Sequence, residues 1–141
     1  MRLWHKDLIT VLPRQQLLGQ WRECGAIARN ISESGTPNHI LVNRMMDYPL
    51  GHFYWYSRII CDEMEERGYN PNWEKFRDYP IFQNKVFIMI SYGEIFKAWH
   101  NKRYLLQCYS NLEEKYDCGA ISKDDWQNVV DKVYSLQATL N

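Results

Sequence analysis

Apolar residues recur every three or four positions in the first third of the chain, which is the spacing of one face of an α-helix. After Pro13 this stripe consists of Leu17, Trp21, Cys24, Ala28 and Ile31. Proline is favoured at the first helical position, where its missing N–H removes no hydrogen bond. Residues 32–37 combine serine, glycine and proline and end the pattern. We therefore expect a helix from Pro13 to about Ile31.

Two further helices are predicted on either side of Pro49. Asn38 follows a proline and suits a helix N-cap, so a helix is expected from Asn38 to Met46. A longer helix is expected from Leu50 to about Arg67, followed by Gly68, because glycine commonly occupies the position after a helix end. Its apolar stripe includes Phe53, Tyr56, Ile60 and Met64.

Beyond this helix the pattern is less regular. Prolines and asparagines favour an irregular connection over residues 69–85. The short apolar run from Val86 to Ile90 fits either a strand or a helix, and we interpret it as helical because its surroundings are helical. A long helix is then expected from about Glu94 to Tyr116.

The last predicted helix runs from Ser122 to Gln137. Ser122 suits the N-cap, and Asp124 and Asp125 lie in the first turn, where carboxylates interact favourably with the helix dipole. Taken together, the patterns predict an all-α fold. Residues 1–141 are expected to form one compact single-domain helical bundle with one long irregular connection.

The composition is that of a soluble globular protein, with 141 residues, 45% hydrophobic and 24% charged. No apolar stretch reaches the length of about 18 residues that a membrane span needs, and the start turns polar too soon for a signal peptide. The four cysteines and four histidines are scattered without ligand spacing. We therefore expect a cytoplasmic monomer without a metal site or a cofactor.

The charges cancel overall but are unevenly distributed. The 17 basic and 17 acidic residues give zero formal charge, so no global attraction draws the chain to nucleic acid. Residues 1–60 hold seven basic and four acidic groups, whereas residues 61–141 hold ten and thirteen. A polyanionic partner would therefore bind the N-terminal part.

The predicted first helix carries the best candidate site. Side chains at i, i+3, i+4 and i+7 share one face, which here is small and polar. This face consists of Gln16, Gly19, Gln20 and Glu23. A neighbouring basic stripe could grip phosphates, because the guanidinium fork matches phosphate oxygens. The stripe consists of Arg14, Gln15, Arg22 and Arg29. From spacing alone, the alternative is a solvated helix face with one Arg–Glu pair.

Three segments resemble a known family. The first comprises Met1-Arg2-Leu3-Trp4-His5, Leu8-Ile9 and Leu12-Pro13-Arg14-Gln15-Gln16-Leu17-Leu18-Gly19-Gln20-Trp21-Arg22-Glu23-Cys24. The second is Glu63-Met64-Glu65-Glu66-Arg67-Gly68-Tyr69-Asn70, and the third is His100 with Leu112-Glu113-Glu114-Lys115. On these segments, which span about two thirds of the chain, the sequence resembles the pyrimidine-dimer DNA glycosylase family.

The resemblance implies a mechanism. Family members are all-α proteins that cut the N-glycosidic bond at a damaged base and then nick the strand at the abasic site. Their nucleophile is the N-terminal α-amine, and a Glu on the first helix is the essential carboxylate. These roles fall on Met1 and Glu23, because Arg2 is too large for Met1 to be removed. An α-amine is a weaker base than a lysine amine, so more of it is neutral and nucleophilic at neutral pH.

The resemblance also implies a partner, double-stranded DNA with a lesion or an abasic site. Asn43 and Arg44 lie where the family has a polar segment that faces DNA. His100 and Arg103 form a second basic spot, for which the residues themselves indicate a surface position and the resemblance a place near the site. The expected DNA-binding residues are Arg2, Arg14, Gln15, Arg22, Arg29, Asn43, Arg44, His100 and Arg103.

A second hypothesis is a non-catalytic DNA- or protein-binding module on the same helical scaffold. The zero net charge favours it. So does the end of the sequence, which lacks the aromatic-rich basic tail of the family's type member.

Overall fold

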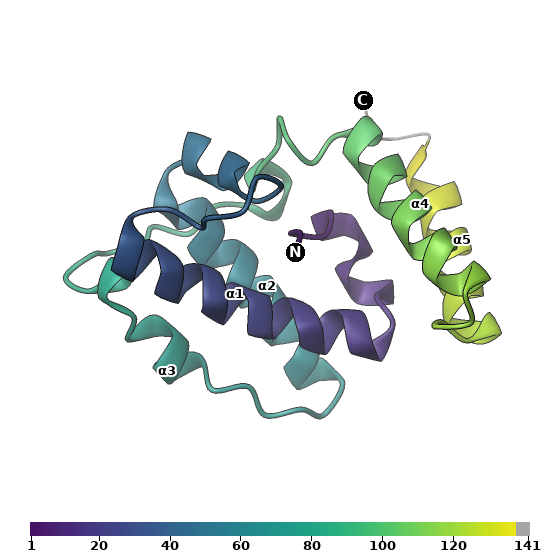
Figure 1. The fold of residues 1–141 in the computed structure, drawn as a ribbon, viewed down its shortest axis with the longest axis horizontal. Coiled ribbons are helices and arrows are strands. Elements are labelled where there is room, and N and C mark those ends of the chain that lie inside the picture. Colours follow the sequence, from purple (N-terminus) through teal and green to yellow (C-terminus); the bar gives the residue numbers. More distant parts are fainter. Residues whose placement is uncertain (138–141) are drawn as a thin grey trace.

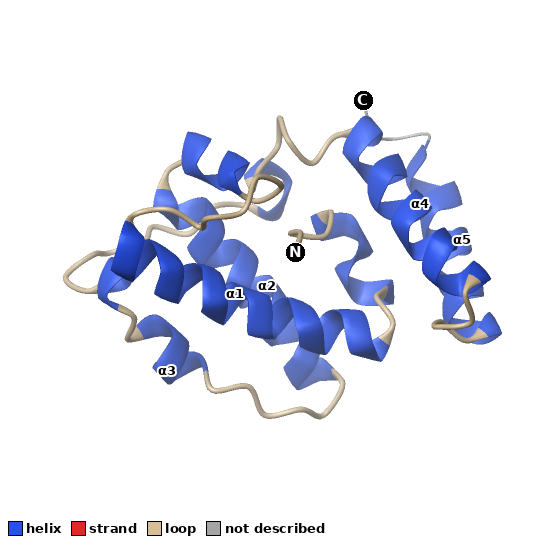
Figure 2. Ribbon diagram, in the orientation of Figure 1, coloured by secondary structure: helices blue, strands red, loops and turns tan. Residues whose placement is uncertain are grey.

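The computed structural model describes residues 1–137 as helices joined by loops, with no strand in that range, so the all-α prediction is confirmed (Figures 1 and 2). The last four residues of the predicted 1–141 unit lie outside the described residues. With η denoting a 3₁₀ helix, the elements are η1 (Lys6–Val11), α1 (Arg14–Ser34), η2 (Asn43–Asp47), α2 (Leu50–Glu66), α3 (Trp73–Arg77), η3 (Pro80–Phe82), η4 (Tyr92–Glu94), α4 (Lys102–Asp117) and α5 (Lys123–Gln137).

Helices α1 and α2 pack against each other and form the larger part of the core. The sequence predicts Pro13 as the first residue of this helix, but Pro13 is the N-cap of α1 and the helix begins at Arg14. The helix also runs three residues beyond Ile31, to Ser34. It ends there because Gly35 adopts the left-handed conformation, with φ 77°, and donates its N–H to the Ile31 carbonyl at 2.8 Å.

The N-terminal segment lies inside the molecule. Figure 1 shows it between the α1–α2 pair and the α4–α5 hairpin, with the N-terminus near the middle of the view. Its 3₁₀ helix η1, which hydrophobic periodicity did not predict, contacts both α2 and α5. Leu8, Ile9 and Leu12 are almost fully buried there. The first residues of the chain therefore belong to the core, although chain termini are usually loosely held.

Arg67 holds this segment from the end of α2. Its guanidinium donates to the carbonyls of Leu12 at 2.8 Å, Ile9 at 3.3 Å and Thr10 at 3.2 Å. Nε pairs with Glu63 at 2.8 Å, which orients the fork. Gly68 follows at φ 89°, so the helix stops where Arg67 can turn toward η1. The second family-like segment thus has a structural role, which is to hold η1 in place.

The helix predicted from Asn38 to Met46 is wrong in its first half. Asn38 has φ 61°, a left-handed conformation that cannot begin an α-helix, and only the 3₁₀ helix η2 forms from Asn43 onward. The helix predicted from Val86 to Ile90 is also wrong. This segment runs across α2 without helical hydrogen bonds, and the Trp55 indole donates to the Ile88 carbonyl at 3.0 Å.

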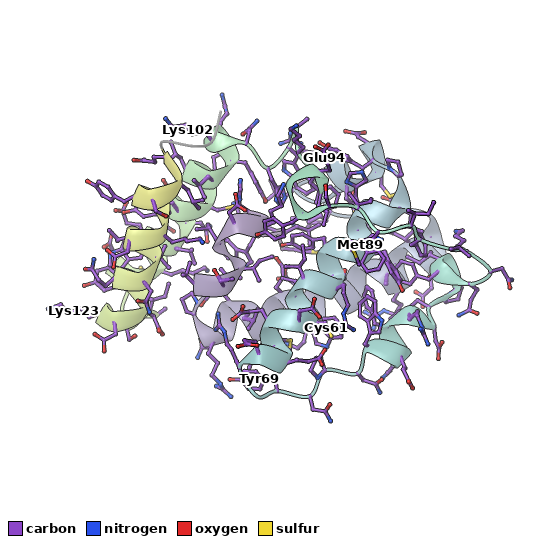
Figure 3. All side chains as sticks on the ribbon, turned by 180° about the vertical axis from the view of Figure 1, so that it is seen from behind. Cys61, Tyr69, Met89, Glu94, Lys102 and Lys123 are labelled. Carbon is purple, nitrogen blue, oxygen red and sulfur yellow. The ribbon has the colours of Figure 1, made fainter. Side chains whose placement is uncertain are left out.

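Figure 3, seen from behind, shows the segment through Met89 crossing α2, the helix that carries Cys61. Residues 69–85, predicted to be irregular, contain the short helices α3 and η3. The long helix predicted from Glu94 begins only at Lys102. Phe96 has φ 50°, and Asn101 starts a new helix by accepting the Tyr104 N–H at 3.0 Å.

The predicted last helix is confirmed. Ser122 Oγ accepts the Asp125 N–H at 3.1 Å, as an N-cap does, and Val129 and Val133 are buried. Among the described residues, no helix has the length and apolar content that crossing a membrane requires.

Candidate active site

The backbone of the N-terminal segment is fixed by side chains from three helices. Met1 is 39% exposed, whereas Leu3, Trp4 and His5 are buried. The Tyr104 hydroxyl of α4 donates to the Leu3 carbonyl, and the Tyr56 hydroxyl of α2 donates to the Trp4 carbonyl at 2.6 Å. Burial raises the pKa of both phenols far above the usual range, so they remain donors. Among residues 1–6, only Met1 and part of Arg2 are therefore accessible from the surface.

Gln20 of α1 makes the third connection. Its Oε1 accepts the Trp4 N–H at 2.7 Å, and its Nε2 donates to the Arg2 carbonyl at 2.9 Å. The same Nε2 donates to Glu23 Oε2 at 3.2 Å. One amide nitrogen thus bonds both the main chain of Arg2 and the Glu23 carboxylate. Gln20 therefore links Glu23 to the main chain of Arg2, the residue directly after Met1.

The Arg2 side chain lies toward α4. Its guanidinium is 3.7 Å from Cys108 Sγ and packs over the rings of Trp4 and Tyr104, with 5.6 and 6.0 Å from Cζ to the ring centroids. Arg2 is half-buried in this position. Its contacts fix the N-terminal segment against α4 and leave part of the cation accessible.

The basic stripe predicted on α1 is exposed as expected. Gln15, Arg22 and Arg29 are all exposed, and Arg14 donates from Nε to the Tyr69 hydroxyl at 2.8 Å. Arg22 also borders a cleft of about 270 Å³ between α1 and α3, which Lys75 lines from the other side. The two cations line one cleft and are suited to an anionic ligand, and one of them, Arg22, is next in sequence to Glu23.

The remaining predicted contacts come from other elements. Asn43 and Arg44 are exposed on η2, where Asn43 Oδ1 accepts the His39 N–H at 3.2 Å. Arg44 packs its guanidinium over Trp99, with 5.4 Å from Cζ to the ring centroid. Arg103 is exposed near the start of α4. Trp99 in turn contacts Tyr104, at 5.4 Å between ring centroids, so Arg44 and Arg2 lie over one pair of adjoining rings.

The surface position predicted for His100 is wrong. Its side chain is only 2% exposed, and its Nδ1 accepts the Lys6 N–H at 2.9 Å. The His5 ring stacks on it, with 5.0 Å between centroids, and donates from Nε2 to the His100 carbonyl at 2.9 Å. Burial lowers the pKa of His100 and brings the pKa of His5 down to about 4. A neutral ring this deep has no surface for DNA, so His100 supports the N-terminal segment from within the core.

Sequence reasoning missed the residues that hold the site together. Gln20 stood on the predicted polar face, but its spacing gave no sign that the chain terminus would return to it. Tyr56 and Tyr104 belong to apolar stripes, and periodicity predicts that such rings are buried without indicating what their hydroxyl groups bond. Within residues 1–137, no group of three or more His, Cys, Asp or Glu side chains is arranged to hold a metal ion.

Comparisons with known proteins give one finding. The family model described as pyrimidine dimer DNA glycosylase matches residues 1–76. These residues include the N-terminal segment, α1, α2 and all of α3 except its last residue. Neither the search of curated proteins nor the search of solved structures found a match. Because the matched region covers more than half of the 141 residues, the chain belongs to the pyrimidine dimer DNA glycosylase family.

Proposed function

We propose that this protein is a DNA glycosylase with AP lyase activity that uses the Met1 α-amine as its nucleophile and Glu23 as its essential carboxylate. One observation carries the proposal. The Gln20 amide bonds the Arg2 carbonyl and Glu23 Oε2 at the same time, at 2.9 and 3.2 Å. This arrangement links the main chain next to Met1 to the carboxylate, which supports a reaction that needs the amine and the carboxylate on one sugar.

The chemistry follows from these two groups. The neutral amine attacks C1′ of the damaged nucleotide, and the bond from C1′ to the base breaks as the new C–N bond forms. The sugar ring then opens to a Schiff base. Loss of a C2′ proton expels the 3′ phosphate by β-elimination and nicks the strand. Glu23 would stabilise the cationic sugar and assist the proton transfers.

The substrate must be distorted for this attack. C1′ lies inside the duplex, so the DNA must kink and a base must leave the stack, which a lesion makes easier. The exposed Arg22 and Arg29 of α1, with Arg14 beside them, are suited to hold the phosphates of such a bent duplex. Asn43, Arg44 and Arg103 would extend the contact from η2 and α4.

Borohydride trapping tests the nucleophile. Untagged protein is incubated with an abasic-site duplex or with a duplex that carries a pyrimidine dimer, and borohydride reduces any Schiff base to a stable adduct. We expect an adduct in which the peptide starting at Met1 carries the DNA. A short peptide fused before Met1 converts the amine to an amide and should abolish both the adduct and cleavage.

Glu23→Gln tests the carboxylate. We expect the variant to form an adduct with an abasic site but to cleave the strand at least about 100-fold more slowly, the lower end of the usual contribution of a general acid or base. Glu33→Gln is the matched control, because Glu33 is exposed at the other end of the same helix. Absence of any adduct with the untagged wild type would reject the mechanism and favour the non-catalytic module.

A further inference from the structure

We propose that Gln20 is a positioning residue, which sets the Met1 amine and the Glu23 carboxylate in register for attack on one sugar carbon. This inference rests on the function proposed above and adds a third residue to it. The Gln20 side chain is 1% exposed and touches no solvent that could replace its bonds. It approaches the N-terminal main chain at two points and Glu23 at a third.

The orientation of the Gln20 amide is fixed by partners that bond in only one sense. The Trp4 N–H can only donate, so the amide atom 2.7 Å away must be the oxygen. The Arg2 carbonyl can only accept, so the atom 2.9 Å away must be the nitrogen. A flipped amide would oppose donor to donor and acceptor to acceptor. Gln20 therefore always presents its NH₂ group to Glu23.

Both amide hydrogens are then occupied. One reaches the Arg2 carbonyl and the other reaches Glu23 Oε2. The Tyr56 hydroxyl lies 3.0 Å from Gln20 Oε1 and 2.6 Å from the Trp4 carbonyl. Its single proton can serve only one of these acceptors at a time. Tyr56 thus donates to the main chain at Trp4, while the Gln20 amide is the group that reaches Glu23.

The Gln20 amide hydrogen-bonds the N-terminal main chain in the way that a neighbouring β-strand would. It accepts from residue 4 and donates to residue 2, which is the pairing that one edge of an extended strand offers. Such a two-point contact fixes the direction of the chain as well as its distance from α1. The position of Met1, one residue further, follows from it. Because Gln20 and Glu23 lie on the same face of α1, this contact also sets the position of the amine relative to the carboxylate.

Gln20→Glu separates positioning from folding. Glutamate has nearly the same shape and can still accept the Trp4 N–H, but when ionised it cannot donate to the Arg2 carbonyl and repels Glu23. The measurements are the single-turnover cleavage rate of an abasic duplex already bound to the protein, the rate of borohydride trapping, the Kd for DNA and the thermal midpoint. All rates are normalised to the folded fraction.

We expect both rates to fall about 100-fold at pH 8, the loss typical of a misplacement near 1 Å, with the Kd within about threefold of the wild type. The deficit should shrink as the pH falls, because a protonated glutamate regains one O–H donor. Gln127→Glu is the matched control. Gln127 Nε2 donates to Asp131 Oδ1 at 2.9 Å on the exposed face of α5. The same chemical change there should leave both rates and the Kd unchanged and lower the thermal midpoint only slightly, because it places two carboxylates four residues apart.

Gln20→Asn provides a second variant in case Gln20→Glu does not fold. Its amide is one methylene shorter and cannot reach both partners, so it should also lower the rate on bound DNA. Wild-type rates in either folded variant would overturn the positioning role. A wild type that forms no adduct would instead overturn the proposed function, so the two failures are distinguishable.

Discussion

Arg67 shows how much of this molecule depends on a single side chain outside the proposed site. Three carbonyls at the end of η1 have Arg67 as their donor, and Glu63 orients its guanidinium. The sequence indicated the importance of this position only through resemblance, and the resemblance gave it no role. The contacts give it one, because these carbonyls end the segment that leads back to the N-terminus.

Arg67→Met should therefore destabilise the protein. It removes three hydrogen bonds from a charged donor, one of them to the half-buried Leu12 carbonyl, and we expect the free energy of unfolding in urea to fall by about 2–3 kcal/mol, the range for hydrogen bonds that involve a charged group. Arg77→Met on α3 is the control, because Arg77 is an exposed arginine and should change the value by less than about 0.5 kcal/mol. Equal unfolding curves for the two variants would contradict the role of Arg67.

At the scale of elements, the N-terminal segment is held by neutral imidazoles. Burial brings the pKa of His5 down to about 4, although the nearby Asp7 carboxylate favours the charged ring. Burial also lowers the pKa of His100, and the positive charges of Lys6 and Arg44 act in the same direction. In the unfolded chain both rings have the ordinary histidine pKa near 6.5. Unfolding between these pH values therefore takes up protons, and acid favours the unfolded chain.

The urea midpoint should accordingly be constant above about pH 6.5 and fall steadily from pH 6.5 toward pH 4. His5→Gln removes one of the two titrating groups and should make the slope shallower. The check is a series of urea titrations at fixed ionic strength. A midpoint that stays level from pH 7 to pH 4.5 would show that the buried imidazoles are not coupled to folding.

The elements also show what the sequence could predict. Helices α1, α2 and α5 carry long apolar stripes and clear end signals, and these were predicted within a few residues. The helix prediction for residues 86–90 is wrong because five apolar residues are too few to distinguish a helical period from a strand period, and because packing against α2 decides their conformation. The surface position predicted for His100 is wrong for a related reason. An imidazole is found both on surfaces and in cores, and only its tertiary partners decide between the two.

For the site, a motif and a helical period predict Glu23 and the arginines of α1, and these residues stay a prediction. The sequence could not identify Gln20 as the link to the terminus, because that link joins residues 2, 4, 20 and 56, which no local pattern connects. The relation between the terminus and α1 is a tertiary fact.

At the scale of the whole molecule, a zero net charge implies that DNA affinity comes from a few local contacts. If Arg14, Arg22 and Arg29 each neutralise one phosphate, they should together contribute about 3 to the slope with which log Kd rises with log salt. Arg22→Gln and Arg29→Gln should each reduce that slope by about one.

Fluorescence anisotropy with an abasic duplex over a range of salt concentrations measures this slope. Arg77→Gln removes a charge from the exposed side of α3 and should leave it unchanged. A slope equally reduced by all three substitutions would mean that net charge, and not the stripe on α1, governs binding.

The internal course of the N-terminal segment has a consequence for the time at which the protein becomes competent. Tyr104 bonds the Leu3 carbonyl, and the main chain of His100 bonds His5. These partners of the N-terminal segment therefore follow it by about 100 residues in the sequence. At a synthesis rate of about 5–20 residues per second, the terminus waits several seconds for them. The amine that emerges first from the ribosome is therefore placed last. An incomplete chain that ends before α4 carries Met1, Gln20 and Glu23 but lacks the bonds from Tyr104 and His100, so we expect the proposed site to be complete only when synthesis is nearly finished.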